Sequence, residues 1–128
     1  MLKKIGFPLL CAGSLFATSA FSITEHVFTQ GLSVEYEFAP NDPQVFSNIF
    51  FWEVKANCTV ISNEPVTPFS ATMLRKSGSL NYSPLVAGDT LVISVQPGDT
   101  FHITAESGAK VELTNLGNDL IKANCATG

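Results

Sequence analysis

The chain has 128 residues, of which 45% are hydrophobic and 14% charged, and its formal net charge at pH 7 is −4. A chain of this length has room for one domain but not for two. The acidic balance argues against nucleic acid and against an anionic membrane surface as partners, because affinity for phosphate groups requires clustered cations.

The first 22 residues have the layout of a secretory signal peptide. Lys3 and Lys4 precede an apolar run over 5–16, and small residues follow up to Ser22. We expect cleavage after Ser22 and a mature domain over 23–128 that is secreted or periplasmic. No membrane insertion is expected, since the apolar run is shorter than the roughly 20 residues of a spanning helix. Cleavage leaves five cationic and eleven acidic residues, a net charge of 5 − 11 = −6.

Residues 32–38 are predicted to form the first strand of the mature chain, because apolar and polar side chains alternate there with a period of two. The next residues, 39–48, contain two prolines and are predicted to form a long loop. A second long loop, again with two prolines, is predicted over 62–68. Because binding residues are often carried by loops, these two segments are candidate parts of a contact surface.

The most sharply patterned strand is predicted over residues 50–60. Its even positions are apolar or small, and its odd positions after Phe51 are polar or charged. This alternation places Cys58 on the buried face of the strand and Phe51 on the exposed face.

Three aromatic residues in or near this strand are candidate binding residues, namely Phe46, Phe51 and Trp52. Core packing accounts for most aromatic side chains, and the period of two predicts it for Trp52. Phe51 is predicted to point outward, where an aromatic ring can cover a sheet edge, contact a protein partner or a second copy, or stack on a sugar.

The second half of the chain is predicted to consist of short strands separated by glycine turns. Strands are expected over 69–76, around 80–82, and over 91–95, 101–105, 109–114 and 121–125. The sequences AGDT at 87–90 and PGDT at 97–100 are predicted turns, because glycine allows positive φ angles and aspartate accepts local backbone hydrogen bonds. Seven or eight short strands without helical periodicity predict an all-β fold. We expect a single antiparallel β-sandwich with Greek-key connections, either immunoglobulin-like or jelly-roll-like.

The residues KANC occur twice, in VKANC at 54–58 and in IKANC at 121–125. In both copies the cysteine lies on the apolar face of its predicted strand. Cys58 and Cys125 are the only cysteines after residue 22, and exported compartments favour disulfides, so we predict that they pair. Closing a loop of this length stabilises a fold by about 4 kcal/mol in the chain-entropy model. Two free thiols, or half of a metal site, are the alternative.

His26 and His102 are the candidate catalytic bases of the mature chain. Ser94, His102 and Asp99 provide the residue types of a nucleophilic triad. A glycine-flanked serine elbow, which positions the nucleophile in many hydrolases, does not occur in the sequence. A surface role is the commoner one for an outward-facing strand histidine.

Pairs of acidic residues are the second candidate for catalysis. Glu35 and Glu37 share one predicted strand face, and Glu106 and Glu112 flank a predicted turn. Glycoside hydrolysis requires two carboxylates facing each other across a cleft, whereas acidic residues on a strand usually only solvate it. The aspartates of the two GDT turns are candidate calcium ligands without a dense ligand loop. No cofactor or metal is expected.

Several blocks resemble small exported proteins of Gram-negative bacteria. The resemblance is carried by residues 50–58, by Gly98 to Thr100, by SGAKVELTNLG at 107–117 and by Cys125. The resemblance implies export and a β domain closed by a disulfide, and it implies no particular activity.

These observations favour a secreted or periplasmic binding module that is not an enzyme, with its contact surface on the proline-rich loops and the Phe51 face. Its ligand would be a protein or a glycan, and a homodimer is a further option. A secreted hydrolase that uses acidic residues or His102 is the first alternative. A small inhibitor of extracellular hydrolases is the second.

Overall fold

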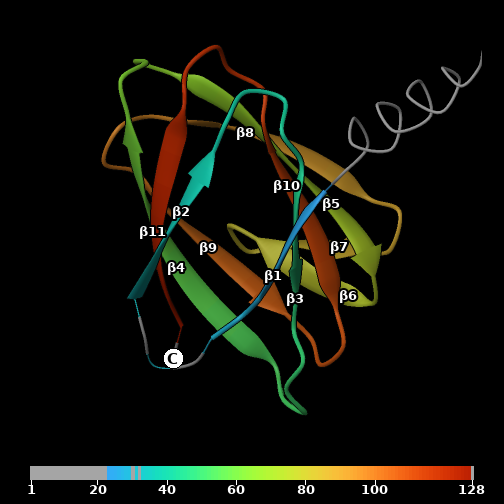
Figure 1. Cartoon of the computed structure of the whole chain (residues 1–128). Coiled ribbons are helices and arrows are strands. Elements are labelled where there is room, and N and C mark those ends of the chain that lie inside the picture. Colours follow the sequence, from blue (N-terminus) through green and yellow to red (C-terminus); the bar gives the residue numbers. More distant parts are fainter. Residues whose placement is uncertain (1–22, 30, 32, 128) are drawn as a thin grey trace, which may run out of the picture.

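The computed structural model describes residues 23–29, 31 and 33–127, so the predicted signal peptide lies outside the described residues. Two β-sheets pack face to face as a sandwich (Figure 1). Within the described part of the chain, no helix has the length and hydropathy needed to span a membrane. The strands are β1 (Thr24–Val27), β2 (Ser33–Phe38), β3 (Gln44–Ser47), β4 (Val54–Ser62), β5 (Thr67–Arg75), β6 (Ser77–Leu80), β7 (Ser83–Val86), β8 (Thr90–Val95), β9 (Thr100–Ala105), β10 (Lys110–Asn115) and β11 (Ile121–Thr127).

The two sheets have a simple pairing rule. The five-stranded sheet has the order β1-β3-β10-β5-β8, and the six-stranded sheet has the order β2-β11-β4-β9-β6-β7. Strand β3 pairs with β10, β4 with β9, β5 with β8 and β6 with β7, all antiparallel. These eight strands therefore form one long hairpin rolled around the core, which is the jelly-roll arrangement, one of the two predicted types.

Three further strands extend this roll. Strand β11 pairs with β4 and carries β2 on its other edge, both antiparallel. Strand β1 adds to the edge of the other sheet by pairing with β3, and this pair is parallel. The predicted sandwich is confirmed, with eleven described strands in place of seven or eight and with one parallel pair.

The predicted loop over 39–48 is wrong in its second half, because β3 occupies Gln44–Ser47. The burial of β3 does not alternate: Gln44, Val45 and Phe46 are all buried. The buried amide of Gln44 has partners for both of its ends. Nε2 donates to the carbonyl of Glu37 at 2.5 Å, and Oε1 lies 2.7 Å from His26 Nε2. A strand that buries a glutamine does not show the period of two on which the prediction depended.

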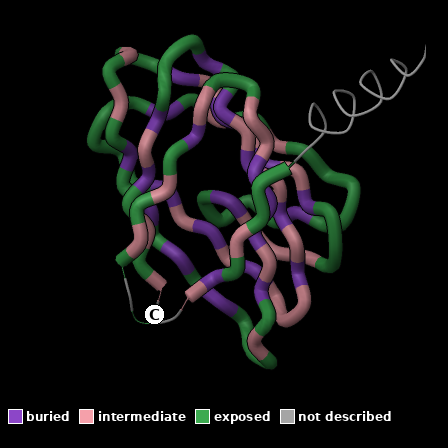
Figure 2. Tube along the Cα trace, viewed as in Figure 1, coloured by how far each residue is buried: buried purple, intermediate pink, exposed green. Residues whose placement is uncertain are grey.

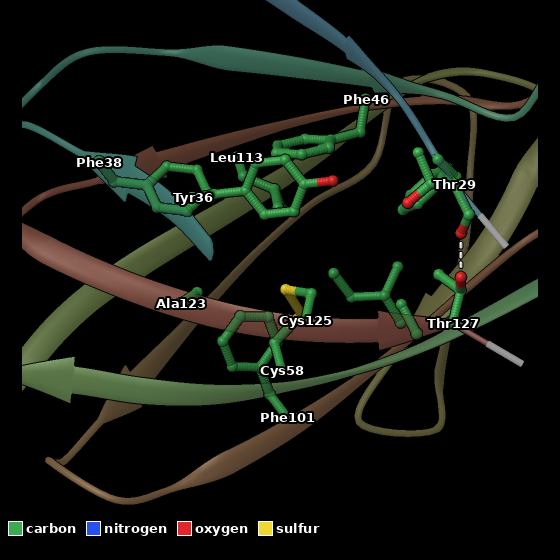
Figure 3. A pocket seen from close by; sticks show the side chains of 13 residues that line it. Thr29, Tyr36, Phe38, Phe46, Cys58, Phe101, Leu113, Ala123, Cys125 and Thr127 are labelled. Atoms are coloured by element: carbon green, nitrogen blue, oxygen red, sulfur yellow. Dashed lines mark hydrogen bonds between the residues drawn. A yellow bond between two sulfur atoms is a disulfide. The ribbon is translucent and has the colours of Figure 1, made fainter. Parts of the chain in front are cut away.

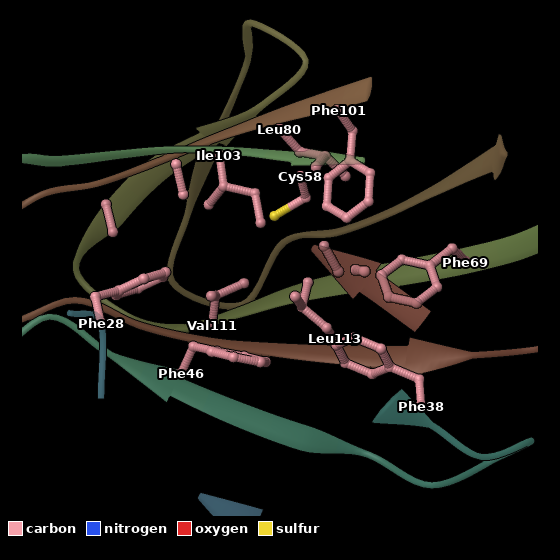
Figure 4. Packing of buried hydrophobic residues seen from close by; sticks show 14 of the residues in the cluster. Phe28, Phe38, Phe46, Cys58, Phe69, Leu80, Phe101, Ile103, Val111 and Leu113 are labelled. Atoms are coloured by element: carbon pink, nitrogen blue, oxygen red, sulfur yellow. The ribbon is translucent and has the colours of Figure 1, made fainter. Parts of the chain in front are cut away.

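The core lies between the sheets and is rich in phenylalanine. Buried positions alternate with more exposed ones along most strands (Figure 2). Phe46 and Phe69 of the five-stranded sheet face Phe101 and Cys58 of the six-stranded sheet, and Phe38 of β2 packs against Phe69 (Figure 4). The ring centroids of Phe38 and Phe69 are 5.2 Å apart in an edge-to-face arrangement, a favourable aromatic geometry.

The repeated KANC sequences lie on neighbouring strands of the six-stranded sheet. Strands β4 and β11 are antiparallel neighbours, and Cys58 is directly opposite Cys125 in their register. The predicted disulfide between these two cysteines is present. The repeat therefore marks two strands that meet at their cysteines.

The two predicted GDT turns are confirmed. Gly88 and Gly98 have φ angles of 97° and 87°, which favour glycine. Asp89 Oδ2 accepts a hydrogen bond from the backbone N–H of Val86 at 3.0 Å. Asp99 Oδ2 does the same for Gln96 at 2.8 Å, so both aspartates close their own turns.

Candidate functional site

The three predicted binding residues have different environments. Phe46 is 3% exposed and packs in the core, so it does not offer a contact surface. Trp52 is 51% exposed, although the predicted alternation placed it inward, and its ring stacks on Phe50 with centroids 4.9 Å apart. Phe51 is 94% exposed, which confirms its outward position.

Residues 48–53 form a loop, because β4 begins at Val54 and not at the predicted Phe50. The loop is organised by Asn48, a polar residue that is only 2% exposed. Asn48 Nδ2 donates to the carbonyls of Trp52 and Ala105, both at 2.9 Å, and Oδ1 accepts from the backbone N–H of Phe50 at 2.8 Å. These bonds hold the loop in a fixed shape.

A second set of bonds ties this loop to the turn between β9 and β10. The backbone N–H of Asn48 donates to the carbonyl of Ala109, and the N–H of Gly108 donates to the carbonyl of Asn48. Ser107 Oγ donates to the carbonyl of Phe50 at 2.7 Å. Phe51 therefore projects from a loop that is fixed on both sides.

Cationic side chains share a hollow with Phe51. Phe51, Ile49, Arg75 and Lys110 line an open hollow of about 560 Å³, and Ile49 is itself 64% exposed. Lys76 lies beside it, since a Cβ on Gly108 would be 3.4 Å from its Cε. We call Ile49, Phe51, Arg75, Lys76 and Lys110 the Phe51 surface.

The Phe51 surface gathers three of the five cations of residues 23–128. Among the residues that the structure describes, the one salt bridge lies elsewhere, between Lys122 and Glu37 at 3.9 Å. A negative net charge thus conceals a local positive region. The sequence analysis missed it because Arg75 and Lys110 are distant in sequence and become neighbours only through the pairing of β5 with β10.

The proline-rich loops lie at the opposite end of the sandwich from the loop over residues 48–53 (Figure 1). Pro40 bridges to Asn115, and the carbonyl of Pro68 accepts from the N–H of Leu116 at 2.9 Å. Asn115 and Lys110 are the two ends of β10. A strand of this length spans roughly 17 to 20 Å, so the proline-rich loops and the Phe51 face do not form one continuous surface.

The residues weighed as a nucleophilic triad are not brought together. Ser94 lies on β8 of the five-stranded sheet, whereas His102 lies on β9 of the other sheet. The His102 ring contacts the side-chain oxygen of Asn57 through Nδ1. Sheets in a sandwich are about 10 Å apart, so Ser94 and His102 do not reach each other.

One residue of each candidate acidic pair has another partner. Glu37 pairs with Lys122, and Glu106 accepts a hydrogen bond from the Ser77 hydroxyl. Over the described residues, no group of three or more His, Cys, Asp or Glu side chains is placed to hold a metal ion.

An apolar cavity beside the disulfide opens between the sheets (Figure 3). Phe46 and Leu113 line one side, and Cys58 and Cys125 line the other. The space has room for one water-sized sphere, about 20 Å³, which is too small for an organic ligand. We therefore assign this cavity to the core.

Tyr36 also lines this cavity, and burial raises the pKa of its phenol above the ordinary value of 10.0. The folded state thus keeps the phenol proton at pH values where the unfolded chain loses it. The contribution of the Tyr36 phenol to the free energy of unfolding should be complete below pH 10. It should be lost as the pH rises through the raised pKa. We expect the Tyr36→Phe protein to lose less stability than the parent between pH 8 and pH 11. Urea unfolding at both pH values measures this, and equal losses would contradict it.

Comparison of the chain with protein-family models, with curated proteins and with solved structures found no match. The Phe51 surface is therefore judged on its geometry alone. It combines an exposed ring, a rigid loop and cations that form no salt bridge with another described residue.

Proposed function

We propose that this protein is an exported binding protein that contacts a protein partner through the Phe51 surface. The observation that carries the proposal is the 94% exposure of Phe51 on a loop held by buried hydrogen bonds. The disulfide supports export, because such bonds persist mainly in oxidising compartments.

A rigid exposed aromatic residue suits binding for an energetic reason. Burying a phenylalanine side chain contributes about 1.5 to 3 kcal/mol. The Asn48 bonds already fix the loop, so little conformational entropy is lost when Phe51 meets its partner. Aromatic and arginine residues are also the types that dominate binding energy at protein interfaces.

The partner's chemistry follows from the charges around the ring. Arg75 and Lys110 border the hollow beside Phe51, so the complementary surface is an apolar pocket flanked by carboxylates. A symmetric homodimer through this face is disfavoured, since each copy would present the same cations to the other.

Site-specific photo-crosslinking in the cells that make the protein tests the proposal. We expect a benzophenone amino acid at position 51 to give one discrete adduct in the periplasmic or secreted fraction. The same group at Val92, a valine 54% exposed on β8, is the matched control and should give none.

Two further results bear on the proposal. Arg75→Glu and Lys110→Glu, introduced together, should abolish the position-51 adduct because they reverse the charge at its border. An equal yield of adduct at positions 51 and 92, or an adduct found only in the cytosol, would overturn the proposal.

A hydrolase inhibitor is the second candidate, and a specific observation favours it. The loop between β3 and β4 projects beyond the strand ends (Figure 1), and Phe51 is an exposed residue of this loop. A rigid projecting loop fits a cleft. The same photo-crosslinking experiment separates the candidates, because the adduct of an inhibitor would contain a hydrolase whose cross-linked residue lies in its active-site cleft.

A further inference from the structure

The turn between β6 and β7 has an unusual backbone. It contains two residues, Asn81 and Tyr82, whose φ angles are 49° and 69°. Positive φ at both positions is the type I′ geometry, in which asparagine is common first and glycine is common second. A bulky side chain at the second position costs conformational energy, so something other than turn formation accounts for Tyr82.

The turn places the Tyr82 ring against His102 on the outer side of the six-stranded sheet. The two ring centroids are 5.1 Å apart at an interplanar angle of 34°. Asn81 fixes this arrangement from both directions: its N–H donates to the carbonyl of His102 at 2.8 Å, and its Oδ1 accepts from the N–H of His102 at 2.9 Å. The Tyr82 side chain is nevertheless 76% exposed.

A shallow hollow of about 190 Å³ lies beside these rings. Tyr82, His102, Lys55, Asn57 and Thr104 line it. Adjacent strands bring these residues together, since Asn57 is opposite His102 and Lys55 is opposite Thr104 in the pairing of β4 with β9. Within the described part of the chain, Lys55 Nζ and Asn57 Nδ2 have no protein hydrogen-bond partner.

We propose that this hollow binds a sugar ring of a glycan. The exposed face of Tyr82 provides an apolar plane for the C–H groups of a pyranose, and the ammonium, amide and hydroxyl groups around it match the sugar hydroxyls. The hollow offers an apolar face together with polar groups, and this combination matches a sugar ring better than a purely apolar ligand. Of the described residues, Lys55 is the one Lys or Arg that lines the hollow, whereas a nucleic acid strand requires several.

This sugar site is separate from the Phe51 surface. Its lining residues belong to β4, to β9 and to the β6–β7 turn, whereas Arg75 and Lys110 belong to β5 and β10 of the other sheet. The two proposals stand or fall independently.

A glycan array covering neutral and acidic oligosaccharides, followed by titration of the best hit, tests the sugar site. We expect the parent protein to bind at least one glycan and Tyr82→Phe to bind it within about threefold, because the ring remains. Tyr82→Gly should bind at least about tenfold more weakly, since the stacking plane is lost. Its melting temperature should be equal or higher, because glycine relieves the positive φ.

The unchanged or raised stability of Tyr82→Gly separates lost binding from lost folding. Asn57→Ala is a second variant and should weaken binding by removing an amide donor at the rim. The proposal is overturned if no glycan binds the parent more tightly than it binds Tyr82→Gly. Mononucleotides and a short single-stranded oligonucleotide are titrated in parallel, and binding confined to them would also overturn the proposal and would assign the Tyr82 ring to base stacking.

Discussion

Replacing both disulfide cysteines, Cys58→Ala together with Cys125→Ala, is expected to lower the free energy of unfolding by about 4 kcal/mol. The bond joins residues 67 positions apart, so its loss raises the conformational entropy of a long segment of the unfolded chain. The free energy of unfolding of a small domain is about 5 to 15 kcal/mol, so this change removes a large share of the stability.

The location of the bond adds a structural reason. Strand β11 holds β2 at the edge of the six-stranded sheet, and β11 is itself held to the rest of that sheet by β4 and the disulfide. Weakening the contact between β4 and β11 therefore weakens the attachment of two strands at once.

Urea denaturation at neutral pH measures this effect, and reduction provides its control. The parent protein under strong reductant should lose most of the same stability, whereas the double alanine variant should not respond to reductant. Because Cys58 is 1% exposed, a small extra loss in the alanine variant is expected from lost packing. A reduced parent as stable as the oxidised one would contradict the prediction.

Strands with one buried face were predictable from the sequence. Strand β9 buries Phe101, Ile103 and Ala105 in strict alternation, and the GDT turns before β8 and β9 carry glycines at positive φ. In these segments a period of two and turn chemistry act locally, so nearby residues were sufficient to identify them.

Residues 50–53 show where the local pattern misleads. Phe50 and Trp52 continue the alternation of β4 backwards, yet they lie in the loop that Asn48 organises. The partners of Asn48 include the carbonyl of Ala105, 57 residues away, and no local pattern reports such a bond.

The residues of the two proposed sites could likewise not be identified from local sequence patterns. The Phe51 surface combines residues from three distant segments that only the rolled pairing of strands brings together. Tyr82 was missed for a different reason, because Asn-Tyr is not a common type I′ pair and the turn was read as part of a strand. Its position at the tip of the rolled hairpin follows from the pairing of β6 with β7.

Asn48→Ala is expected to lower the free energy of unfolding by about 3 kcal/mol. The change removes the donor to the carbonyls of Trp52, Ala105 and Glu106, and it removes the acceptor for the N–H of Phe50. A buried polar group left without a partner costs about 1 to 3 kcal/mol, and the carbonyl of Ala105 lies in the buried part of this network. Urea denaturation measures the loss.

The chain offers a matched control at the other end of the sandwich. Asn115 is also fully buried, and its Nδ2 donates to the carbonyls of Phe38 and Asp119 at 2.9 and 2.8 Å. Its Oδ1 accepts from the N–H of Gly117 two residues on, as Asn48 does from Phe50. We expect Asn115→Ala to cost a similar amount of stability without disturbing residues 48–53.

The two alanine variants together test whether loop order matters for binding. At a temperature where both are fully folded, Asn48→Ala should weaken the position-51 photo-adduct, because the freed loop must be ordered again on contact. Asn115→Ala should leave the adduct unchanged, since the hydrogen bonds of Asn115 lie at the opposite end of β10 from Lys110. Equal losses in both variants would mean that global stability, and not the Asn48 network, governs the Phe51 contact.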